Sequence, residues 1–370
     1  MTTTYPPYTA GTGVSGPGSN NAGTVNWSAT GGQQDSYEAF GCKVPDLDPI
    51  KTPDWSPAKV YFERKVFTNG VRTFWDGKQV TYWGFEDTIK GKDQKPFPSP
   101  LIRLREGDLA HVQLETRTGP HTIHHHGIEP TTMNDGVGHV SFETSGRYVY
   151  QWRPRHAGTW FYHCHVNTVL HFEMGLFGLL VVDPPEGWGI PYKDGAAHRY
   201  DTEKFWVADD IDPKWHGLNH GAGLCGDDVG LNIFKPKYFL VSGVDKTQTR
   251  THVNSAIRTS QGKKVLIRIL NASYSMLGIK IKGLNSELIS VDGHALVSPE
   301  RPWSKALTIP ADTEFHMATA MRHALWIDTT GVPKGTYTVE FKYYDWITKK
   351  VHNAGQGNYE GTAETTITIL

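Results

Sequence analysis

The sequence predicts an all-β protein made of two β-sandwiches behind an extended N-terminal arm. From Val60 onward, short runs rich in Val, Ile, Thr and aromatic residues alternate with turns rich in Gly, Pro and Asp, which is typical of sandwiches and barrels. Convincing amphipathic helices are absent. The chain has 370 residues, a length that suits two domains of ordinary size, each with its own core.

The composition divides the chain into four stretches. Residues 1–55 are rich in Gly, Ser, Thr, Asn and Pro and predict an extended arm that orders only where it docks. Residues 56–190 hold runs such as KVYFERKVF and GLFGLLVV and predict the first sandwich. Residues 183–200, with three prolines and three glycines, predict a linker. Residues 200–370 have the same pattern of short β-rich runs separated by turns, with runs such as KKVLIRILNAS, and predict the second sandwich.

The charge balance excludes some classes of partner. Lys and Arg number 37 and Asp and Glu number 38, so no net field attracts a nucleic acid or an anionic membrane. No run approaches the roughly 18 apolar residues that span a bilayer. The first residues have neither a basic nor an apolar signal region. We therefore expect no nucleic-acid or membrane partner, and a location that is cytoplasmic or, if a signal has been removed, periplasmic or secreted.

The three cysteines are too few for a disulfide scaffold. Cys164 stands between two histidines, which indicates a metal ligand. Cys42 and Cys225 either form a bridge between the arm and the second half or remain two separate buried thiols, because sequence alone does not place their Cα atoms.

Histidines gather in two short segments. The first, GPHTIHHHGIEP, holds His121 and the run from His124 to His126. The second, GTWFYHCHVNTVLHFEMGLFG, has strand-like runs on both sides. Successive side chains of an extended chain point to opposite faces, so Cys164 projects one way and its two neighbouring histidines the other. One strand therefore predicts two sites.

A thiolate and two imidazoles in a trigonal arrangement are the ligands of a blue-copper centre. Cys164 and His171 suit that role, and His121 can supply the second imidazole. The other site would use the histidines that share one face, which are His124, His126, His163 and His165. A structural zinc site is the alternative, but it needs only four ligands in all. We place Cys164 at the edge of its sandwich rather than in the core.

These segments resemble the copper-binding elements of multicopper oxidases. HTIHHHG is similar to the family's His-x-x-His-x-His-Gly element, and HCHVNTVLHFEMGL to its His-Cys-His element with a downstream histidine. RILNASYSMLGIKIKGLNSELISVDGHAL resembles the non-blue domain of the same family. The likeness covers residues 60–370 and implies two cupredoxin-like Greek-key domains.

The resemblance also implies a role for each ligand. It gives the type 1 copper to His121, Cys164 and His171, the type 2 position to His124, and the type 3 pair to His126, His163 and His165. Alignment on the glycines after His171 places Leu176 at the axial position, with Met174 as the alternative. A non-coordinating leucine there raises the reduction potential by removing a soft donor.

Three features depart from the family pattern. The interval from Cys164 to His171 is two residues longer than usual, and the blue domain comes first. The second half lacks the two His-x-His elements that a partner domain normally supplies, although the full cluster uses eight histidines. Single histidines remain there. We favour His294, after the turn VDG, because copper nitrite reductases place a functional histidine near such a turn; the others are His216, His220, His316 and His323.

The remaining histidines predict structural roles. His125 points away from its neighbours and is assigned to the surface or to a supporting shell. His111, His139 and His156 stand in turn or strand-edge contexts. WHGLNHGAGLC reads as a plain loop, with a separate metal site as the alternative.

The resemblance implies a laccase-like oxidoreductase that takes single electrons from a small molecule and reduces dioxygen to water. Copper would be present as type 1 together with type 2, type 3 or both, in a homotrimer. A copper nitrite reductase is the first alternative, although that resemblance would lead us to expect an acidic residue at His124 and no histidine at His165. A blue-copper electron carrier is the second, although a carrier has no use for four further histidines.

Overall fold

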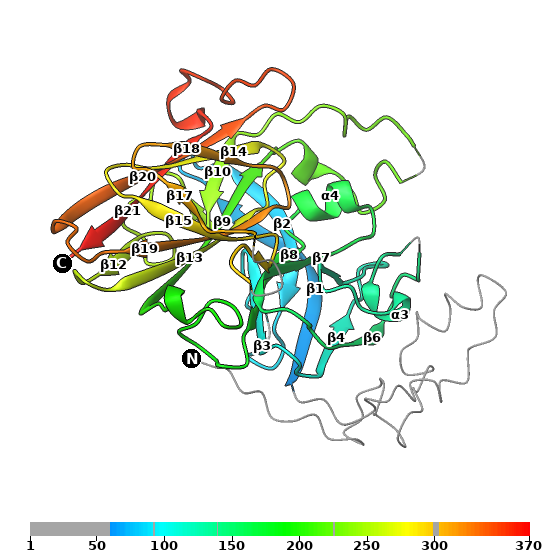
Figure 1. The fold of residues 1–370 in the computed structure, drawn as a ribbon. Helices are drawn as coiled ribbons and strands as arrows, with labels where there is room; N and C mark the ends of the chain where they lie inside the picture. The colour runs from blue at the N-terminus through cyan, green and yellow to red at the C-terminus, as the bar shows by residue number, and fades with distance from the viewer. Residues whose placement is uncertain (1–59, 92, 139, 225, 299–302) are drawn as a thin grey trace.

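The computed structural model describes residues 60–370 except 92, 139, 225 and 299–302. The predicted arm, Cys42 and Cys225 lie outside these residues, as does His139. No described helix is long and apolar enough to cross a lipid bilayer. The regular secondary structure of the described chain is almost entirely β-strand (Figure 1), as predicted.

Two four-stranded sheets form the first sandwich. One has the strand order β2-β1-β4-β6 and the other β3-β8-β7-β5. The bounds are β1 Val60–Thr73, β2 Gln79–Glu86, β3 Ser99–Arg105, β4 Ala110–Glu115, β5 His124–His126, β6 Arg147–Trp152, β7 Gly158–His163 and β8 Phe177–Asp183. The short helices are α3 Thr132–Asp135 and α4 Thr168–Glu173. Every residue of β7 and β8 is buried, because these neighbouring strands are covered on both faces.

The second sandwich has a larger and a smaller sheet. The larger runs β11-β10-β9-β13-β19-β15-β16 with β17 on β15, and the smaller β12-β21-β20-β14-β18. The larger contains β9 Thr202–Ile211, β10 Tyr238–Val241, β11 Val244–Asp245, β13 Lys264–Asn271, β15 Ser286–Val291, β16 His294–Ala295, β17 Leu307–Ile309 and β19 Arg322–Asp328. The smaller contains β12 Ile257–Thr259, β14 Met276–Ile281, β18 Glu314–Met317, β20 Gly335–Tyr344 and β21 Thr362–Ile369. Three single-turn 3-10 helices are η3 Ala196–His198, η4 Trp215–Gly217 and η5 Gly357–Tyr359.

The predicted linker falls between β8 and β9. The domain limits at residues 190 and 200 stay a prediction, but the sheets segregate along the chain at this stretch. Across it, Arg103 binds Asp183 at 2.7 Å and Glu203 at 2.6 Å. Glu203 also binds Arg268 at 2.7 Å, and Arg268 donates to Thr159 of β7 at 3.1 Å. This bidentate, charge-assisted network fixes the second sandwich against the strand that leads to Cys164.

An apolar cluster also joins the two halves. Phe161, Phe172 and Phe177 of the first sandwich pack with Val207 and Leu270 of the second. Burial of aromatic and aliphatic side chains of this size stabilises by about 1.5–3 kcal/mol each. Phe161 belongs to β7 and Phe172 to α4, and so the contact anchors the second histidine segment on the second sandwich.

Candidate metal centre

Cys164 lies at the centre of the first group of donors. Its Sγ is 3.5 Å from Nδ1 of His121 and 3.4 Å from Nδ1 of His171. These separations suit three donors that share one small ion at bond lengths of about 2.0–2.3 Å. All three side chains are 0% exposed. We call these residues the Cys164 group.

Three different elements position the group. Cys164 follows β7, and its N–H donates to the carbonyl of Leu176 at 3.0 Å. His121 pairs with Thr144 in an isolated bridge. His171 comes from α4, a helix that the sequence did not predict, entered through Asn167 in the left-handed region at φ 42°. The helical turn shortens the segment after Cys164 and brings His171 back over the sulfur.

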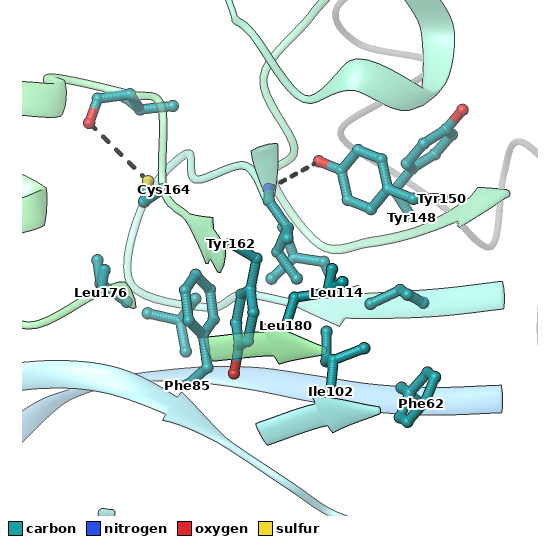
Figure 2. Packing of buried hydrophobic residues seen from close by; sticks show 14 of the residues in the cluster. Phe62, Phe85, Ile102, Leu114, Tyr148, Tyr150, Tyr162, Cys164, Leu176 and Leu180 are labelled. Carbon is teal, nitrogen blue, oxygen red and sulfur yellow. Dashed lines mark hydrogen bonds between the residues drawn. The ribbon is translucent and has the colours of Figure 1, made fainter. Parts of the chain in front are cut away.

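Cys164 is fully buried in the core of the first sandwich, so its predicted place at the sandwich edge is wrong. It packs in one apolar cluster with Tyr162, Leu176 and Leu180, and Figure 2 shows the sulfur at one end of these stacked side chains. Cys164 points to the apolar side of this stretch of chain, while His163 and His165 point to the other side. An apolar shell around a thiolate excludes water and tunes its redox properties.

The protonation of the Cys164 group suits a metal. Burial lowers the pKa of His121 well below its ordinary value and that of His171 to about 4, so both imidazoles are neutral donors at pH 7. Burial raises the pKa of the Cys164 thiol to about 11. Only the thiolate binds a metal, so loading of the site must release the thiol proton.

Four histidines form a second group on the opposite face, and we call it the four-histidine group. In β5, His124 pairs with His163 of β7. One ring nitrogen each of His124, His126 and His163 lies within 4.8 Å of the others. The ring of His165 is 5.4 Å from that of His124 and 5.7 Å from that of His163. Imidazoles at this density suit one or two transition-metal ions.

The two groups face opposite ways along one short stretch of chain. His163 and His165 stack at an interplanar angle of 29° on one side, while Cys164 between them faces His121 and His171. The N–H of His165 donates to Thr122 at 2.9 Å, which fixes the end of the stretch. This is the alternation expected of an extended chain.

His125 is buried, so the surface position, one of its two predicted places, is wrong. The side chain is 0% exposed and lies between Tyr150, at a centroid distance of 5.6 Å, and Trp152, at 4.8 Å. It points away from the other histidines because β5 alternates. Its place is the core side of the strand, and it belongs to neither donor group.

His294 reaches the edge of the four-histidine group without joining it. A recess of about 590 Å³ is lined by His294, His124 and His126. The His294 ring lies 5.3 Å from Trp160. Gly293, at φ +80°, permits this turn because a Cβ there would come within 2.5 Å of the Trp160 ring. Among the described residues, His294 is in neither group of close donors, and its role stays a prediction.

Most other histidines lie apart from both groups. His216 is buried against the carbonyl of Thr81, at 2.6 Å from Nδ1. His316 contacts Glu314 at 3.2 Å, and His323 stacks on Phe315. The structure gives these three no place among the donors. His111 is buried, and His156 lies beside His294.

His220, one of the less favoured second-half candidates, is the histidine that reaches a donor group, and it lies beside the Cys164 group rather than the four-histidine group. A ring nitrogen of His220 lies within 4.8 Å of ring nitrogens of His121 and His171. Its carbonyl accepts from Nε2 of His171 at 3.1 Å, and its own Nε2 lies 3.0 Å from the carbonyl of Pro120. The loop that carries it, from residue 212 to 237, therefore covers the Cys164 group. Because Nε2–H of His171 donates to the carbonyl of His220, the ring proton is on Nε2 and the lone pair of Nδ1 faces the sulfur.

Both candidates for the axial position, Met174 and Leu176, lie in the surroundings of Cys164. Met174 and Leu176 are 1% and 0% exposed and share the apolar cluster of Cys164. The carbonyl of Met174 accepts from Trp83 N at 2.7 Å and that of Leu176 from Cys164 N at 3.0 Å. The preference for Leu176 stays a prediction.

Three carboxyl groups are buried at the end of α4 and in β9: Glu173, Asp209 and Asp210. Burial and mutual repulsion raise the pKa of Glu173 and Asp209 well above the ordinary range, and burial raises that of Asp210 to about 7. Asp210 accepts from the N–H of Tyr274 at 2.9 Å. A buried carboxyl group of this kind keeps its proton in the folded protein.

We expect the contribution of Asp210 to the stability of the protein to fall as the pH rises from about 4 to about 7; the buried histidines contribute with the opposite sign, so Asp210 is tested by comparison with a variant. Over this window the unfolded chain ionises Asp210, with a pKa near 3.9, whereas the folded chain, with a pKa of about 7, retains the proton. At this site the folded state therefore binds more protons, and the contribution of Asp210 to the free energy of unfolding decreases with pH. Thermal melts of the wild type and of Asp210→Asn measure it, and the melting temperature of Asp210→Asn should rise by a few degrees relative to that of the wild type as the pH rises across this window.

Asn at position 210 keeps an oxygen that accepts from the N–H of Tyr274 and cannot ionise. The difference between the two proteins therefore reports the ionisation of Asp210 alone. Asp312→Asn, at an exposed carboxylate, is the matched control and should change the slope less. Equal slopes in the wild type and Asp210→Asn would show that Asp210 titrates as it does in the unfolded chain.

The comparisons with known proteins agree with this geometry. Residues 78–187 match the family model described as multicopper oxidase. They form a multicopper oxidase domain. A copper-containing nitrite reductase from Neisseria meningitidis is 29% identical over 279 residues, 72% of this chain and 63% of its own length. An L-ascorbate oxidase from Cucumis sativus is 32% identical over 185 residues, 46% of this chain and 28% of its own length.

Solved structures extend the likeness of fold beyond the multicopper oxidase domain. A blue copper oxidase from Nitrosomonas europaea has a TM-score of 0.64 at 21% identity and covers 84% of this chain and 85% of its own. A copper nitrite reductase from the same organism has a TM-score of 0.57 at 16% identity and covers 84% and 94%. This confirms the cupredoxin-like architecture. The chain spans less than two thirds of the curated relatives named above.

Proposed function

We propose that the chain is a copper-dependent, laccase-like oxidoreductase that reduces dioxygen to water. A small molecule gives up single electrons at the Cys164 group, and they pass to the four-histidine group. Copper bound at these groups would supply the one-electron redox chemistry. The protein's own work is to hold the donors, exclude water and direct the electron.

The stretch from His163 to His165 carries the proposal. It contributes the sulfur to one group and two imidazoles to the other. His163 Nδ1 is also 2.8 Å from the carbonyl of Cys164. Covalent bonds and one hydrogen bond therefore join the two groups directly. An electron carrier needs no such second group, and so the geometry favours an enzyme.

Residues beside the four-histidine group complete the reaction site. His124 Nδ1 lies 2.8 Å from the carbonyl of Asp135 and 3.3 Å from its carboxylate. The hydrogen bond to this carbonyl places the proton of the ring on Nδ1, and so the lone pair of Nε2 is available to bind a metal. Asp135 and Glu129 line the recess of about 590 Å³ that reaches His124 and His126. These carboxylates suit delivery of the protons that reduction of dioxygen consumes.

A copper nitrite reductase remains the second candidate. The likeness to the Neisseria meningitidis enzyme, over 72% of this chain, favours it. Against it, position 124 is a histidine within the donor group rather than an acid. His165 also stacks on His163 inside the group. Both positions add imidazole donors, which suits a larger metal cluster.

One experiment separates the candidates. We expect the purified, copper-loaded protein to be blue, to hold more than one copper per chain, and to consume oxygen with a phenolic donor. Metal analysis, electron paramagnetic resonance and an oxygen electrode measure these properties. Release of nitric oxide from nitrite without oxygen uptake would establish the reductase instead. One copper per chain without a type 2 signal would establish the carrier.

We also propose that the protein assembles as a homotrimer. Four histidines are half of the eight that the resemblance implies for a full cluster, and the recess beside His124 and His126 opens outward. A neighbouring subunit placed there can supply further donors. The periplasmic, secreted or cytoplasmic location stays an expectation from the sequence.

A further inference from the structure

The Cys164 group has no direct access to solvent. His121, Cys164 and His171 are 0% exposed, and the carbonyl of His220 accepts from His171 Nε2, the ring edge that faces away from the sulfur. Asn167 Nδ2 donates to the carbonyls of His220 at 3.4 Å and Ala222 at 2.9 Å and so holds this cover in place. A reductant must therefore deliver its electron from outside the cover.

A recess of about 640 Å³ lies at the base of the same cover. Four lysines line it, all of them exposed: Lys78, Lys214, Lys235 and Lys237. We call it the lysine recess. Among the described residues, the lysines that form ion pairs with carboxylates all lie outside this recess. Four like charges in one recess of a chain whose net charge is −1 make a local positive field.

Asp212 holds the lysine-bearing segments together. It is the one acidic residue in the wall of the recess, it is 3% exposed, and its carboxylate accepts from the backbone N–H of Lys214 and of Lys235, each at 2.8 Å. Its oxygens therefore face the backbone rather than the ammonium groups. The four positive charges remain available to a ligand of opposite charge.

Two short routes lead from the lysine recess to the Cys164 group. His216 lines the recess, and its Nε2 lies 3.5 Å from Glu173, two residues after His171 in α4. Thr81 also lines it, two residues before Trp83 in β2. The Trp83 ring lies 5.2 Å from that of His171. Buried side chains and covalent bonds thus connect the recess to the covered imidazole.

We propose that the lysine recess binds a small polyanionic reductant, which passes its electron to the Cys164 group through the wall formed by His216 and Thr81. The electron-transfer part rests on the proposed function, whereas the anion site does not. In the step, the anion loses one electron and copper(II) held by Cys164 becomes copper(I). No proton or bond is exchanged, so charge and atoms balance.

Binding is tested first, with a probe that undergoes no redox reaction. Hexacyanocobaltate(III) should bind the full chain in titration calorimetry, with or without copper. The double variant Lys214→Gln, Lys235→Gln should weaken this binding about tenfold or more. Lys334→Gln removes an exposed lysine outside the recess and is the matched control, expected to bind as the wild type does.

Electron transfer is tested next, in the absence of oxygen. The reduced, copper-loaded protein is oxidised by anionic hexacyanoferrate(III) or by cationic tris(phenanthroline)cobalt(III), and the return of blue absorption is followed by stopped flow. The double variant should slow the anion about tenfold or more and leave the cation unchanged or faster, because electrostatic steering changes encounter rates by about 10–1,000-fold. Added salt should slow the anion in the wild type.

The outcomes are distinct. Equal slowing of both oxidants would mean that the lysines act only on structure, and no slowing would place electron uptake elsewhere; either result overturns the route. Absence of hexacyanocobaltate(III) binding overturns the anion site. A colourless copper-loaded protein would refute the proposed function, while the calorimetry would still decide whether the lysine recess binds anions.

Discussion

Cys164→Ser should abolish the blue absorption and lower turnover by more than about 100-fold while the protein stays folded. A serine hydroxyl is a hard, weakly acidic donor, and the strong copper–thiolate interaction is lost with the sulfur. The direct path to His163 and His165 loses its donor at the same time. Absorption spectra, copper analysis and turnover measure the loss.

The stability of this variant follows from the burial of the site. Position 164 is 0% exposed, and a buried hydroxyl without a partner costs about 1–3 kcal/mol. Nδ1 of His121 and of His171 lie 3.5 and 3.4 Å from the sulfur, and one of them can accept the single proton of the new hydroxyl, so the cost is at the lower end. Circular dichroism should show an intact β-fold with a slightly lower melting temperature.

Cys42→Ser is the matched control for thiol removal, since Cys42 lies outside the two histidine segments of the sequence that carry the donors. It should keep the colour and the turnover. A blue Cys164→Ser protein would show that another residue supplies the sulfur ligand, and the assignment of the Cys164 group would be wrong.

The all-β fold was predictable because local pattern and burial agree. In β20 the run VEFKYY alternates buried Val339, Phe341 and Tyr343 with half-buried residues between them. In β8 the apolar run FGLLVVD is buried on both faces. Turn residues separate these runs, so strand content needs no tertiary information.

The two donor groups were predictable for the same reason. Alternation in a strand assigns Cys164 and His163 to opposite faces without knowledge of the fold. The pairing of His124 with His163 is not contained in either segment alone, and the shared face predicted only that these histidines meet. Short-range geometry therefore gave the faces and the grouping, and the family pattern gave the type of copper assigned to each ligand.

What the sequence did not predict depends on contacts between distant residues. His220 meets Pro120 and His171 from the second half of the chain, and nothing in NHGAG distinguishes this loop from an exposed one. The burial of Cys164 arises because side chains of the first sandwich surround it and the loop that carries His220 covers it. The helix α4 is six residues long, too short for a periodic signal. Each of these features required the folded chain.

His163→Ala should keep the blue absorption and lower turnover by at least about 100-fold. The ring of His163 belongs to the four-histidine group and faces away from the sulfur, so the donors His121, Cys164 and His171 keep their geometry. Loss of a partner outside the ligand shell already costs about 10–100-fold, and loss of a ligand should cost no less. Copper per chain should fall, and the type 1 signal should remain.

The matched control is His125→Ala, in β5 on the face opposite to the four-histidine group. Both side chains are buried, so both variants leave a cavity and lower the melting temperature. Only His163→Ala should stop turnover, because His125 contacts Tyr150 and Trp152 rather than the donors. If His163→Ala loses colour and turnover together, the faces of this strand do not separate the two metal sites, and electrons do not cross between them through Cys164.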